Sequence, residues 1–208
     1  YDVSTFFSDA DDADLLSFAV SGLPAGFSID ANGVISGTWA SNASQGGPDA
    51  DGVYQVTVTA SDSSGVVART FTWTVTNPAP VAQNDAGTTN EDTISNGDVL
   101  ADNGAGLDQD PDGDNIAVSE VNGFATGVGA AIAGTNGGSF TILADGSYTF
   151  NPGEDFQDLA DGATRSTSIV YTIDDGNGGT DTAVLLITVT GVDDAPDATD
   201  PIPHRNGG

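Results

Sequence analysis

The side chains of this chain that are best suited to chemistry are aspartates, spaced two apart in a tight turn. Asp108, Asp110 and Asp112 alternate immediately before a glycine, and Asp114 follows it. Alternating carboxylates of this kind open an EF-hand loop, where they converge on a calcium ion. The EF-hand itself is excluded, because Ser119 stands where the loop requires a bidentate Glu and the flanking residues read as strands. The chemistry that remains is calcium binding, which takes about six to eight oxygen ligands and therefore needs other segments of the chain.

Aspartate also dominates the charge of the whole chain. The 208 residues include 31 acidic side chains against three basic ones, which gives a formal net charge of -28. Of these acids, 28 are Asp and three are Glu. The short Asp side chain folds back on turns and chelates hard cations, whereas Glu would serve solubility equally well. We therefore expect loops built around metal, whose binding relieves the self-repulsion; the alternative is a solvated acidic surface.

The composition excludes several classes of partner and site. A chain without a basic patch cannot release phosphate counterions, so nucleic acids and anionic membranes are not expected partners. No apolar run is long enough for direct membrane insertion. The absence of Cys removes disulfides and thiolate sites, and the single His204 leaves zinc without its usual ligands. Magnesium is disfavoured because it prefers octahedral sites that retain water.

A hydrolytic enzyme is also disfavoured. Paired carboxylates hydrolyse glycosides when one of them lies in an apolar pocket with a raised pKa, whereas these acids cluster in turns where their repulsion favours a cation. A Ser-His-Asp set is not available with one histidine near the chain end, and no Gly-rich phosphate loop leads from a strand into a helix. We therefore expect a protein that is not an enzyme.

The elements that must position these acids are strands. Apolar and polar residues alternate over residues 53–59 and 70–75, and again over 169–173 and 183–189. The pair Asp145-Gly146 lies between two further alternating runs and predicts a tight hairpin turn. Convincing helical periodicity is absent. This pattern predicts an all-β fold made of immunoglobulin-like sandwiches.

The chain also repeats itself loosely. Residues 56–76 have the layout of residues 169–190: a strand, an Asp- and Gly-containing turn, and a second strand that ends in alternating threonines. Each copy leaves its last strand through a Pro-containing segment, Asn77–Pro80 in the first and Asp193–Pro196 in the second. We therefore expect a domain boundary near residues 77–82, where two prolines stiffen a short linker.

Several motifs carry a resemblance to known families. Residues 7–15 (FSDADDADL), 23–30 (LPAGFSID) and 33–38 (GVISGT) resemble a dystroglycan-type cadherin-like domain. Residues 80–85 (PVAQND), 90–93 (NEDT), 110–114 (DPDGD), 146–152 (GSYTFNP) and 174–179 (DDGNGG) resemble the VCBS-type cadherin-like repeats of large secreted RTX-type adhesins. Together the two resemblances imply two tandem immunoglobulin-like, cadherin-like Greek-key β-sandwiches.

The resemblance also implies the domain limits. The first sandwich takes residues 1–79 and the second residues 80–196. Residues 197–208 resemble the first strand of a following repeat, or form a disordered end. Tyr1 stands where the first strand of its own domain has already passed, so we expect domain 1 to lack that strand and the chain to be a piece of a longer protein.

The ligands implied by the resemblance fall into three groups. The strongest lies at the pole of the second sandwich that faces domain 1: Asp108, Asp110, Asp112, Asp114, Asp174, Asn77, Asn84 and Asp85. The equivalent group in domain 1 is Asp9, Asp11, Asp14 and Asp62. The third group, at the far pole, is Glu91, Asp193 and Asp194, which a further domain would complete. The expected cofactor of all three is Ca²⁺.

The function implied is that of a calcium-binding structural or adhesion module. Calcium would stiffen a tandem rod in an extracellular adhesin at the bacterial cell surface. The expected partners are neighbouring repeats, with surface polysaccharide or a host-cell ligand as further candidates, and the fragment is expected to be mostly monomeric. An alternative is calcium-dependent carbohydrate binding at Trp39, while alternation places Trp73 in the core. Cell–cell adhesion through strand exchange is a third reading.

Overall fold

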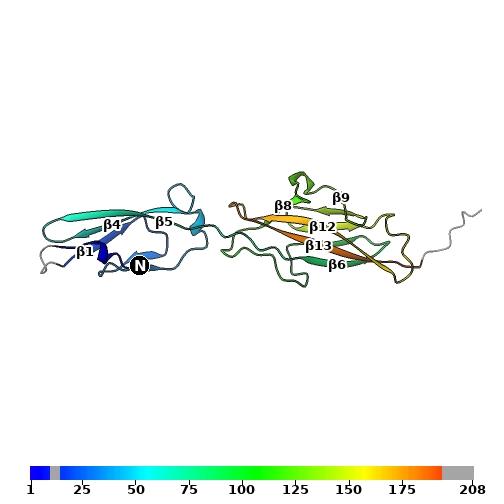
Figure 1. Ribbon diagram of the computed structural model, residues 1–208, viewed down its shortest axis with the longest axis horizontal. Coiled ribbons are helices and arrows are strands. Elements are labelled where there is room, and N and C mark those ends of the chain that lie inside the picture. The colour runs from blue at the N-terminus through cyan, green and yellow to red at the C-terminus, as the bar shows by residue number, and fades with distance from the viewer. Residues whose placement is uncertain (10–14, 194–208) are drawn as a thin grey trace, which may run out of the picture. The chain divides into compact units, whose positions relative to one another are not determined.

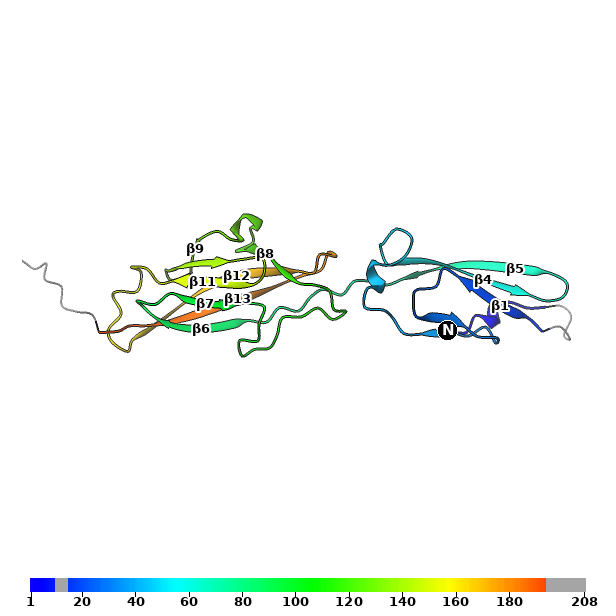
Figure 2. The same cartoon turned by 180° about the vertical axis from the view of Figure 1, so that it is seen from behind.

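The chain is described here by a computed structural model that covers residues 1–9 and 15–193 (Figures 1 and 2). The predicted ligands Asp11, Asp14 and Asp194, and the predicted tail of residues 197–208, lie outside these residues. The described chain forms two compact units. Unit 1 comprises Tyr1–Val81, Gln109–Ala117 and Ile173–Asp181, and unit 2 comprises Ala82–Asp108, Val118–Thr172 and the chain from Thr182 onward.

Unit 1 is built on a three-stranded sheet in the order β1-β4-β5 and a two-stranded sheet of β2 and β3. Its elements are η1 (Ser4–Phe6), β1 (Ser17–Ser21), β2 (Phe27–Ile29), β3 (Ile35–Gly37), η2 (Ala43–Gln45), β4 (Val53–Ser61) and β5 (Val66–Thr74). The predicted alternation of residues 53–59 appears as β4, where Tyr54, Val56 and Val58 are buried on one face. They form the core of unit 1 with Val3 and Ile35.

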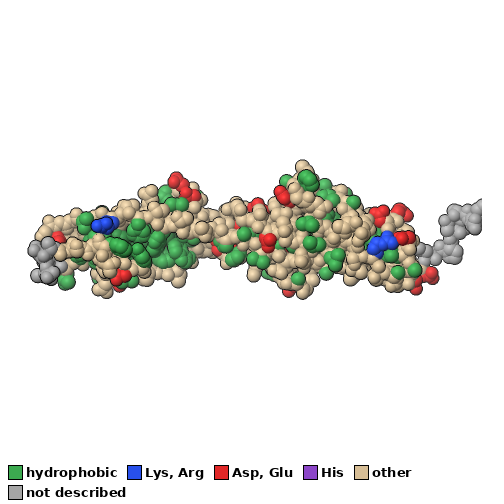
Figure 3. Space-filling model, viewed as in Figure 1, with side chains coloured by type: hydrophobic (Ala, Val, Ile, Leu, Met, Phe, Trp, Pro, Cys, Tyr) green, Lys and Arg blue, Asp and Glu red, His purple; other side chains and the backbone are tan. Residues whose placement is uncertain are grey.

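The last strand of unit 1, β5, is only partly covered. Phe71 and Trp73 pack against the core but are only partly buried. The alternation predicted Trp73 on the core side of the strand, and it lies there without being fully buried. Val66 and Val67 are 73% and 53% exposed. Figure 3 shows hydrophobic side chains gathered on the face of the unit that contains β4 and β5.

Unit 2 contains most of a second pair of sheets, in the orders β7-β11-β10-β9 and β6-β13-β12-β8. Its elements are β6 (Asp85–Asn90), β7 (Ser95–Asp98), β8 (Ala117–Val121), η3 (Ala125–Gly127), β9 (Ile132–Ala133), β10 (Ser139–Ile142), β11 (Ser147–Asn151), β12 (Thr164–Asp174) and β13 (Thr180–Thr190). Side chains that alternate along these strands form the core. Phe140, Phe150, Tyr171 and Leu185 are each fully buried.

The strand pairing agrees with the sequence pattern. The predicted hairpin at Asp145-Gly146 joins β10 to β11, with Ile142 opposite Tyr148, and Gly146 has the positive φ of +88° that the turn requires. In the other sheet β6 runs parallel to β13, from Asp85 opposite Leu185 to Asn90 opposite Thr190. The all-β sandwich prediction is confirmed. The helices among the described residues are single short turns, and none could cross a membrane.

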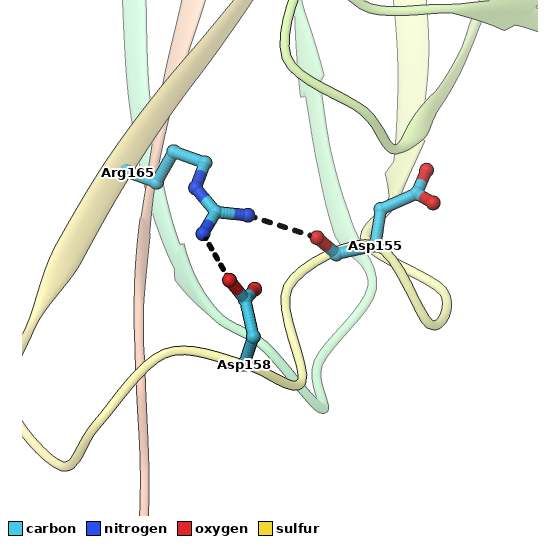
Figure 4. Close-up of polar contacts among 3 residues, drawn as sticks. All are labelled: Asp155, Asp158 and Arg165. Carbon is cyan, nitrogen blue, oxygen red and sulfur yellow. Dashed lines mark hydrogen bonds and ion pairs between the residues drawn. The ribbon is translucent and has the colours of Figure 1, made fainter.

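One ion pair fastens the loop between β11 and β12. Arg165 on β12 donates from Nη2 to Asp158 Oδ2 at 2.7 Å and from Nη1 to the carbonyl of Asp155 at 3.0 Å (Figure 4). The guanidinium also lies 5.6 Å from the ring centre of the buried Phe156. The Asp155 carboxylate points away from this contact and accepts the N–H of Gly138 at 2.7 Å. The loop is therefore held to β12 and to Gly138, the residue before β10, by independent bonds.

Candidate metal centre

The turn at Asp110–Asp114 is shaped by one carboxylate oxygen. Asp110 Oδ1 accepts the backbone N–H groups of Asp112 at 3.0 Å, Gly113 at 3.1 Å and Asp114 at 3.3 Å. Gly113 lies in the left-handed region, with φ of +89°, which a residue with a side chain would adopt only under strain. The turn thus uses one oxygen of Asp110 for its own backbone and leaves the other for a further partner.

Three carboxylates of this turn converge. Each of Asp110, Asp112 and Asp114 offers an oxygen, and these oxygens lie within 4.8 Å of one another. Over residues 1–9 and 15–193, this is the group of three or more His, Cys, Asp or Glu side chains that is close enough to share an ion. Asp110 Oδ2 and Asp112 Oδ1 are buried and have no hydrogen-bond donor. Buried oxygens without donors are costly, and a hard cation would satisfy them, so these residues fit calcium.

The ionisation of the pair reflects this crowding. The contact with the Asp110 carboxyl raises the pKa of Asp112, and burial and the charge of Asp114 raise it further. Burial alone would raise the pKa of Asp110 as well, but its interaction with the Asp112 side chain and the three backbone N–H groups hold the pKa below its ordinary value. Asp110 therefore loses its proton at a lower pH than Asp112, as expected for two adjacent carboxylates with no cation between them.

Neutral side chains from the first part of unit 1 border the cluster. Ser44 Oγ donates to Asp112 Oδ2 at 3.0 Å, and Gln45 Nε2 donates to Asp114 Oδ2 at 2.8 Å. Both contact Asn77 Oδ1, Ser44 at 3.2 Å and Gln45 at 2.9 Å. The predicted ligand Asn77 is thus brought next to the cluster. Ser44 and Gln45 were not predicted, and they come from η2, a three-residue turn with no sequence signal of its own.

The loop between β12 and β13 contributes a second acid next to Asn77. Asn77 Nδ2 donates to Asp175 Oδ2 at 2.7 Å, and Asp175 is 3% exposed. The predicted ligand Asp174 instead accepts the N–H of Gly176 at 2.6 Å and is less buried. Asn177 of the same loop donates to Asp114 Oδ2 at 2.7 Å. The structure therefore brings the neighbouring Asp175, rather than Asp174, into contact with the predicted ligand Asn77.

Two further predicted ligands lie inside unit 2 around a tyrosine. Asp85 and Asp108 are 3% and 4% exposed. The Tyr171 hydroxyl lies 2.8 Å from Asp85 Oδ2, 3.1 Å from Asp108 Oδ2, 2.9 Å from the carbonyl of Gln83 and 3.2 Å from that of Val99. All four are acceptors and the hydroxyl has one hydrogen. Burial, then the hydrogen bond to Asp85 and the charges of both carboxylates, raise the pKa of Tyr171, so the hydroxyl keeps its hydrogen and stays a donor.

The two carboxylates of this cluster are also held by amide donors. Asn103 Nδ2 donates to Asp85 Oδ1 at 2.8 Å, and the N–H of Gln83 donates to Asp108 Oδ1 at 2.6 Å. Burial raises the pKa of Asp85 despite the hydrogen bonds from Asn103 and Tyr171, and the charge of Asp108 contributes to the rise. The structure thus gives Asp85 and Asp108 hydrogen-bond partners inside the fold, which the sequence analysis did not foresee.

The remaining described ligand candidates of unit 2 are dispersed. Asn84 is exposed and accepts the N–H of Val184 at 2.9 Å. Glu91 is 1% exposed, and its Oε1 accepts the N–H of Val192 at 2.7 Å, while Oε2 is buried without a donor. Asp193 follows Val192 and is exposed. Glu91 therefore keeps one buried oxygen without a donor, and its other oxygen contacts the residue before Asp193.

In unit 1, Asp9 and Asp62 are brought together as predicted. A hydrogen bond with the Asp9 side chain, followed by the N–H groups of Ser64 and Gly65, lowers the pKa of Asp62. Asp62 Oδ1 accepts these two N–H groups at 2.6 and 2.7 Å. The turn that holds Asp62 resembles the Asp110 turn, since one carboxylate oxygen is used by the local backbone.

Trp39, the predicted ligand platform, lies at the edge of unit 1. Its side chain is 53% exposed. Its ring centre is 4.6 Å from that of Phe27 and 5.8 Å from that of Trp73. Trp39 is therefore the outer member of an aromatic cluster, packed on one side and open on the other.

Comparison with known families gives the class of protein to which this β-sandwich chain belongs. Residues 77–191 match the model of the bacterial cadherin-like domain, and residues 1–76 match the family described as "Putative Ig domain". The first match covers more than half of the chain, so the chain belongs to the bacterial cadherin-like domain family. Cadherin-like domains typically bind calcium, are typically extracellular and are non-enzymatic in general.

Solved structures similar to the chain include cadherins and an enzyme. EC1-2 of human protocadherin-24 is 20% identical over 90% of this chain and 86% of that chain, with a TM-score of 0.32. EC1-3 of Drosophila N-cadherin is 20% identical over 89% of this chain and 58% of that chain, with a TM-score of 0.38. An endo-fucoidan hydrolase of glycoside hydrolase family 107 is 19% identical over 88% of this chain, which spans 25% of the hydrolase, with a TM-score of 0.34. No protein with a curated description matches the sequence.

Because the pKa of Asp112 is raised, we expect the effect of its substitution on thermal stability to have opposite signs with and without calcium. The folded state favours the neutral carboxyl, so stability from this group is present below the ordinary pKa of 3.8 and is lost as pH rises through the folded pKa. At pH 7 in chelator, Asp112→Asn should therefore match or raise the thermal midpoint of unit 1. In several millimolar calcium the same variant should lower it.

The control for this comparison is Asp49→Asn, which changes an exposed acid of the same unit and should show no change of sign. Thermal unfolding with and without calcium measures both variants. If Asp112→Asn costs as much in chelator as in calcium, carboxylate crowding does not govern this turn.

Tyr171→Phe should destabilise unit 2 by roughly 1–3 kcal/mol, because it leaves the buried oxygens of Asp85 and Asp108 without the hydroxyl donor. Adding Asp85→Asn removes a buried charge and should recover part of that loss. Denaturant unfolding of the three variants measures the effect. A Tyr171→Phe protein as stable as the wild type would show that the hydroxyl does not hold this cluster.

Proposed function

We propose that this chain is a calcium-binding structural module of an extracellular bacterial adhesin, in which calcium stiffens tandem β-sandwiches. The observation that carries the proposal is the pair of buried oxygens of Asp110 and Asp112 that have no donor. Membership of the bacterial cadherin-like family supports the same function. Asp110, Asp112 and Asp114 would hold the ion, and Asn77 and Asp175 lie in the same hydrogen-bonded cluster.

Calcium at this cluster would act on the mechanics of the chain rather than on a substrate. The cluster draws side chains from four stretches of unit 1 that are remote in sequence: η2, Asn77, the Asp110 turn and the loop after β12. An ion there supplies positive charge that offsets the repulsion of the carboxylates. The residues of this chain do the rest, since Ser44, Gln45 and Asn177 fix the outer carboxylate oxygens in place. Loss of the ion would loosen all four stretches together.

A catalytic role receives less support from the same acids. Asp85 has a raised pKa, which a general acid needs, but it is 3% exposed and is bonded to Tyr171 and Asn103. Substrate would have to displace those bonds to reach it. The proposed module is therefore not an enzyme, and its partners are the neighbouring repeats of the parent adhesin.

Carbohydrate binding is a second candidate function, favoured by the exposed ring of Trp39. An aromatic face on an otherwise polar edge is a common stacking surface for sugars. We expect binding on a glycan array to be absent or weak, and any signal to be lost in Trp39→Ala. Strong binding that depends on Trp39 and on calcium would promote this candidate over the structural role, and strong binding that survives Trp39→Ala would exclude the proposed site.

The calcium proposal is tested by thermal unfolding and titration calorimetry. Extracellular calcium modules bind with Kd values of roughly 10⁻⁴ to 10⁻³ M. A concentration of about 10 mM should then stabilise the folded state by roughly 1–3 kcal/mol by mass action. Asp110→Ala should abolish most of this gain, because it removes both the turn acceptor and one free oxygen.

Asp49→Ala is the matched control, since it removes an exposed carboxylate from the same unit and should keep the full calcium gain. The proposal is wrong if the wild type shows no calcium-dependent shift in that range. The assignment of ligands is wrong if Asp49→Ala lowers the gain as much as Asp110→Ala does.

A further inference from the structure

Asparagine followed by glycine recurs along this chain. Six such pairs lie among the described residues, and their asparagines are Asn32, Asn96, Asn103, Asn122, Asn136 and Asn177. A glycine after asparagine favours attack of its backbone nitrogen on the side-chain amide carbon, because no Cβ obstructs the approach. The attack also requires that the asparagine side chain can turn toward that nitrogen. The structure therefore decides which of the six pairs can react.

Three of these asparagines are held through their side-chain N–H groups. Their Nδ2 atoms donate at 2.7 or 2.8 Å to acceptors that are remote in sequence: Asn103 to Asp85 Oδ1, Asn136 to the carbonyl of Ser166 and Asn177 to Asp114 Oδ2. Rotation of each side chain toward the next backbone nitrogen would break this bond and leave the acceptor without it. The attack is therefore opposed by the fold at these three positions.

Two further asparagines are held through their side-chain oxygens. Asn96 Oδ1 accepts the hydroxyl of Thr149 at 2.9 Å, and Asn122 Oδ1 accepts the backbone N–H of Val170 at 3.1 Å. Both asparagines are also restrained through the backbone. Asn96 pairs with Thr149 within the sheet, and the N–H of Asn122 donates to the carbonyl of Val170 at 2.9 Å. The attack is therefore opposed by the fold at these two positions as well.

Asn32 differs from the other five asparagines. It is exposed, and its side chain makes no hydrogen bond to any residue that the structure describes. It lies in the turn between β2 and β3, where its N–H donates to Asp30 Oδ1 at 2.9 Å and the N–H of Gly33 donates to the carbonyl of Asp30 at 3.1 Å. The opening of this short exposed turn is enough to release the nitrogen of Gly33, and such turns open at a small cost in free energy.

We propose that Asn32 is a site of spontaneous covalent modification, in which its amide is converted to a carboxylate. The backbone nitrogen of Gly33 loses its proton and attacks Asn32 Cγ, and the new N–Cγ bond closes a succinimide ring. The Cγ–Nδ2 bond breaks, and Nδ2 takes up a proton and leaves as ammonia. Water then adds to one of the two ring carbonyls and cleaves its bond to the ring nitrogen, which leaves aspartate or isoaspartate at position 32. One water is consumed and one ammonia is released, with no oxidation or reduction.

The product alters the turn that leads into the core of unit 1. Asp30 Oδ1 accepts the N–H groups of both Asn32 and Val34, at 2.9 and 2.8 Å. Isoaspartate inserts a methylene group into the backbone between these two donors, and either product places a second negative charge near Asp30. Ile35, the residue after Val34, is 2% exposed and belongs to the core. The reaction therefore weakens unit 1 with time and leaves unit 2 unchanged.

The positions of the arginines allow a direct test by mass spectrometry. Cleavage after Arg69, Arg165 and Arg205 places Asn32 alone of the six in residues 1–69, four asparagines in residues 70–165 and Asn177 in residues 166–205. The folded protein is aged in mildly alkaline buffer, then unfolded and digested with trypsin, and an unaged sample gives the baseline. Residues 1–69 should gain about 1 Da, because the amide nitrogen is replaced by oxygen. Each pair in the other two fragments should react roughly 5-fold or more slowly, the effect of one typical hydrogen bond.

Asn32→Gln should abolish the gain in residues 1–69, because the longer side chain cyclises far more slowly. The matched control is Asn42→Gln, which changes an exposed asparagine of the same fragment that is followed by Ala43, and it should keep the gain. In denaturant, where the hydrogen bonds are absent, all six pairs should react at similar rates. The proposal is overturned if residues 1–69 gain mass no faster per pair than the other fragments, or if the gain survives Asn32→Gln. An equal preference for Asn32 in denaturant would also overturn it, because the fold would then not select the site.

Discussion

The interaction on which this structure depends is the repulsion between carboxylates that the fold forces close together. In the Asp110 turn, three backbone N–H groups neutralise one oxygen, and the turn then directs the second oxygen toward Asp112 and Asp114. The hydrogen bonds of the turn thus bring carboxylates together, and the described residues supply no positive charge that would offset their repulsion. A bound cation would offset this repulsion, as proposed above, in a chain whose net charge is -28.

In unit 2, two buried carboxylates lie close together and are bridged by a tyrosine hydroxyl. Asp85 begins β6 and Asp108 lies in the connection between β7 and β8, and the Tyr171 hydroxyl on β12 is within hydrogen-bond distance of both. Because burial favours the neutral carboxyl of Asp85, this cluster tolerates low pH and a dry core. One chain therefore has two kinds of acid cluster, one open to an ion and one closed by a protein donor. Under the proposed function, the first of these clusters would couple the fold to the calcium concentration.

Much of the fold follows from the sequence, and the site follows in part. Period-two alternation identified β4, β12 and β13, because one face of each strand is buried. Ile169, Tyr171 and Ile173 are buried, and the same alternation predicts that Asp175 is buried as well, which it is. The resemblance to the family indicated Asp174 instead. Ser44 and Gln45 could not be found in this way, since a three-residue turn has no period and its contacts are long-range. The pairing of Tyr171 with Asp85 joins residues 86 apart and was equally invisible to local patterns.

The central claim is that calcium relieves the repulsion at the Asp110 cluster and thereby orders the segments around it. Hydrogen exchange of backbone amides, followed by mass spectrometry with calcium and with chelator, tests this most directly. The account predicts that calcium slows exchange selectively in peptides that contain Asp112–Asp114 and Asn177–Gly179, whose amides bond to the cluster's carboxylates. Peptides around Tyr171 should change little. Equal exchange of the cluster amides in calcium and in chelator would contradict it.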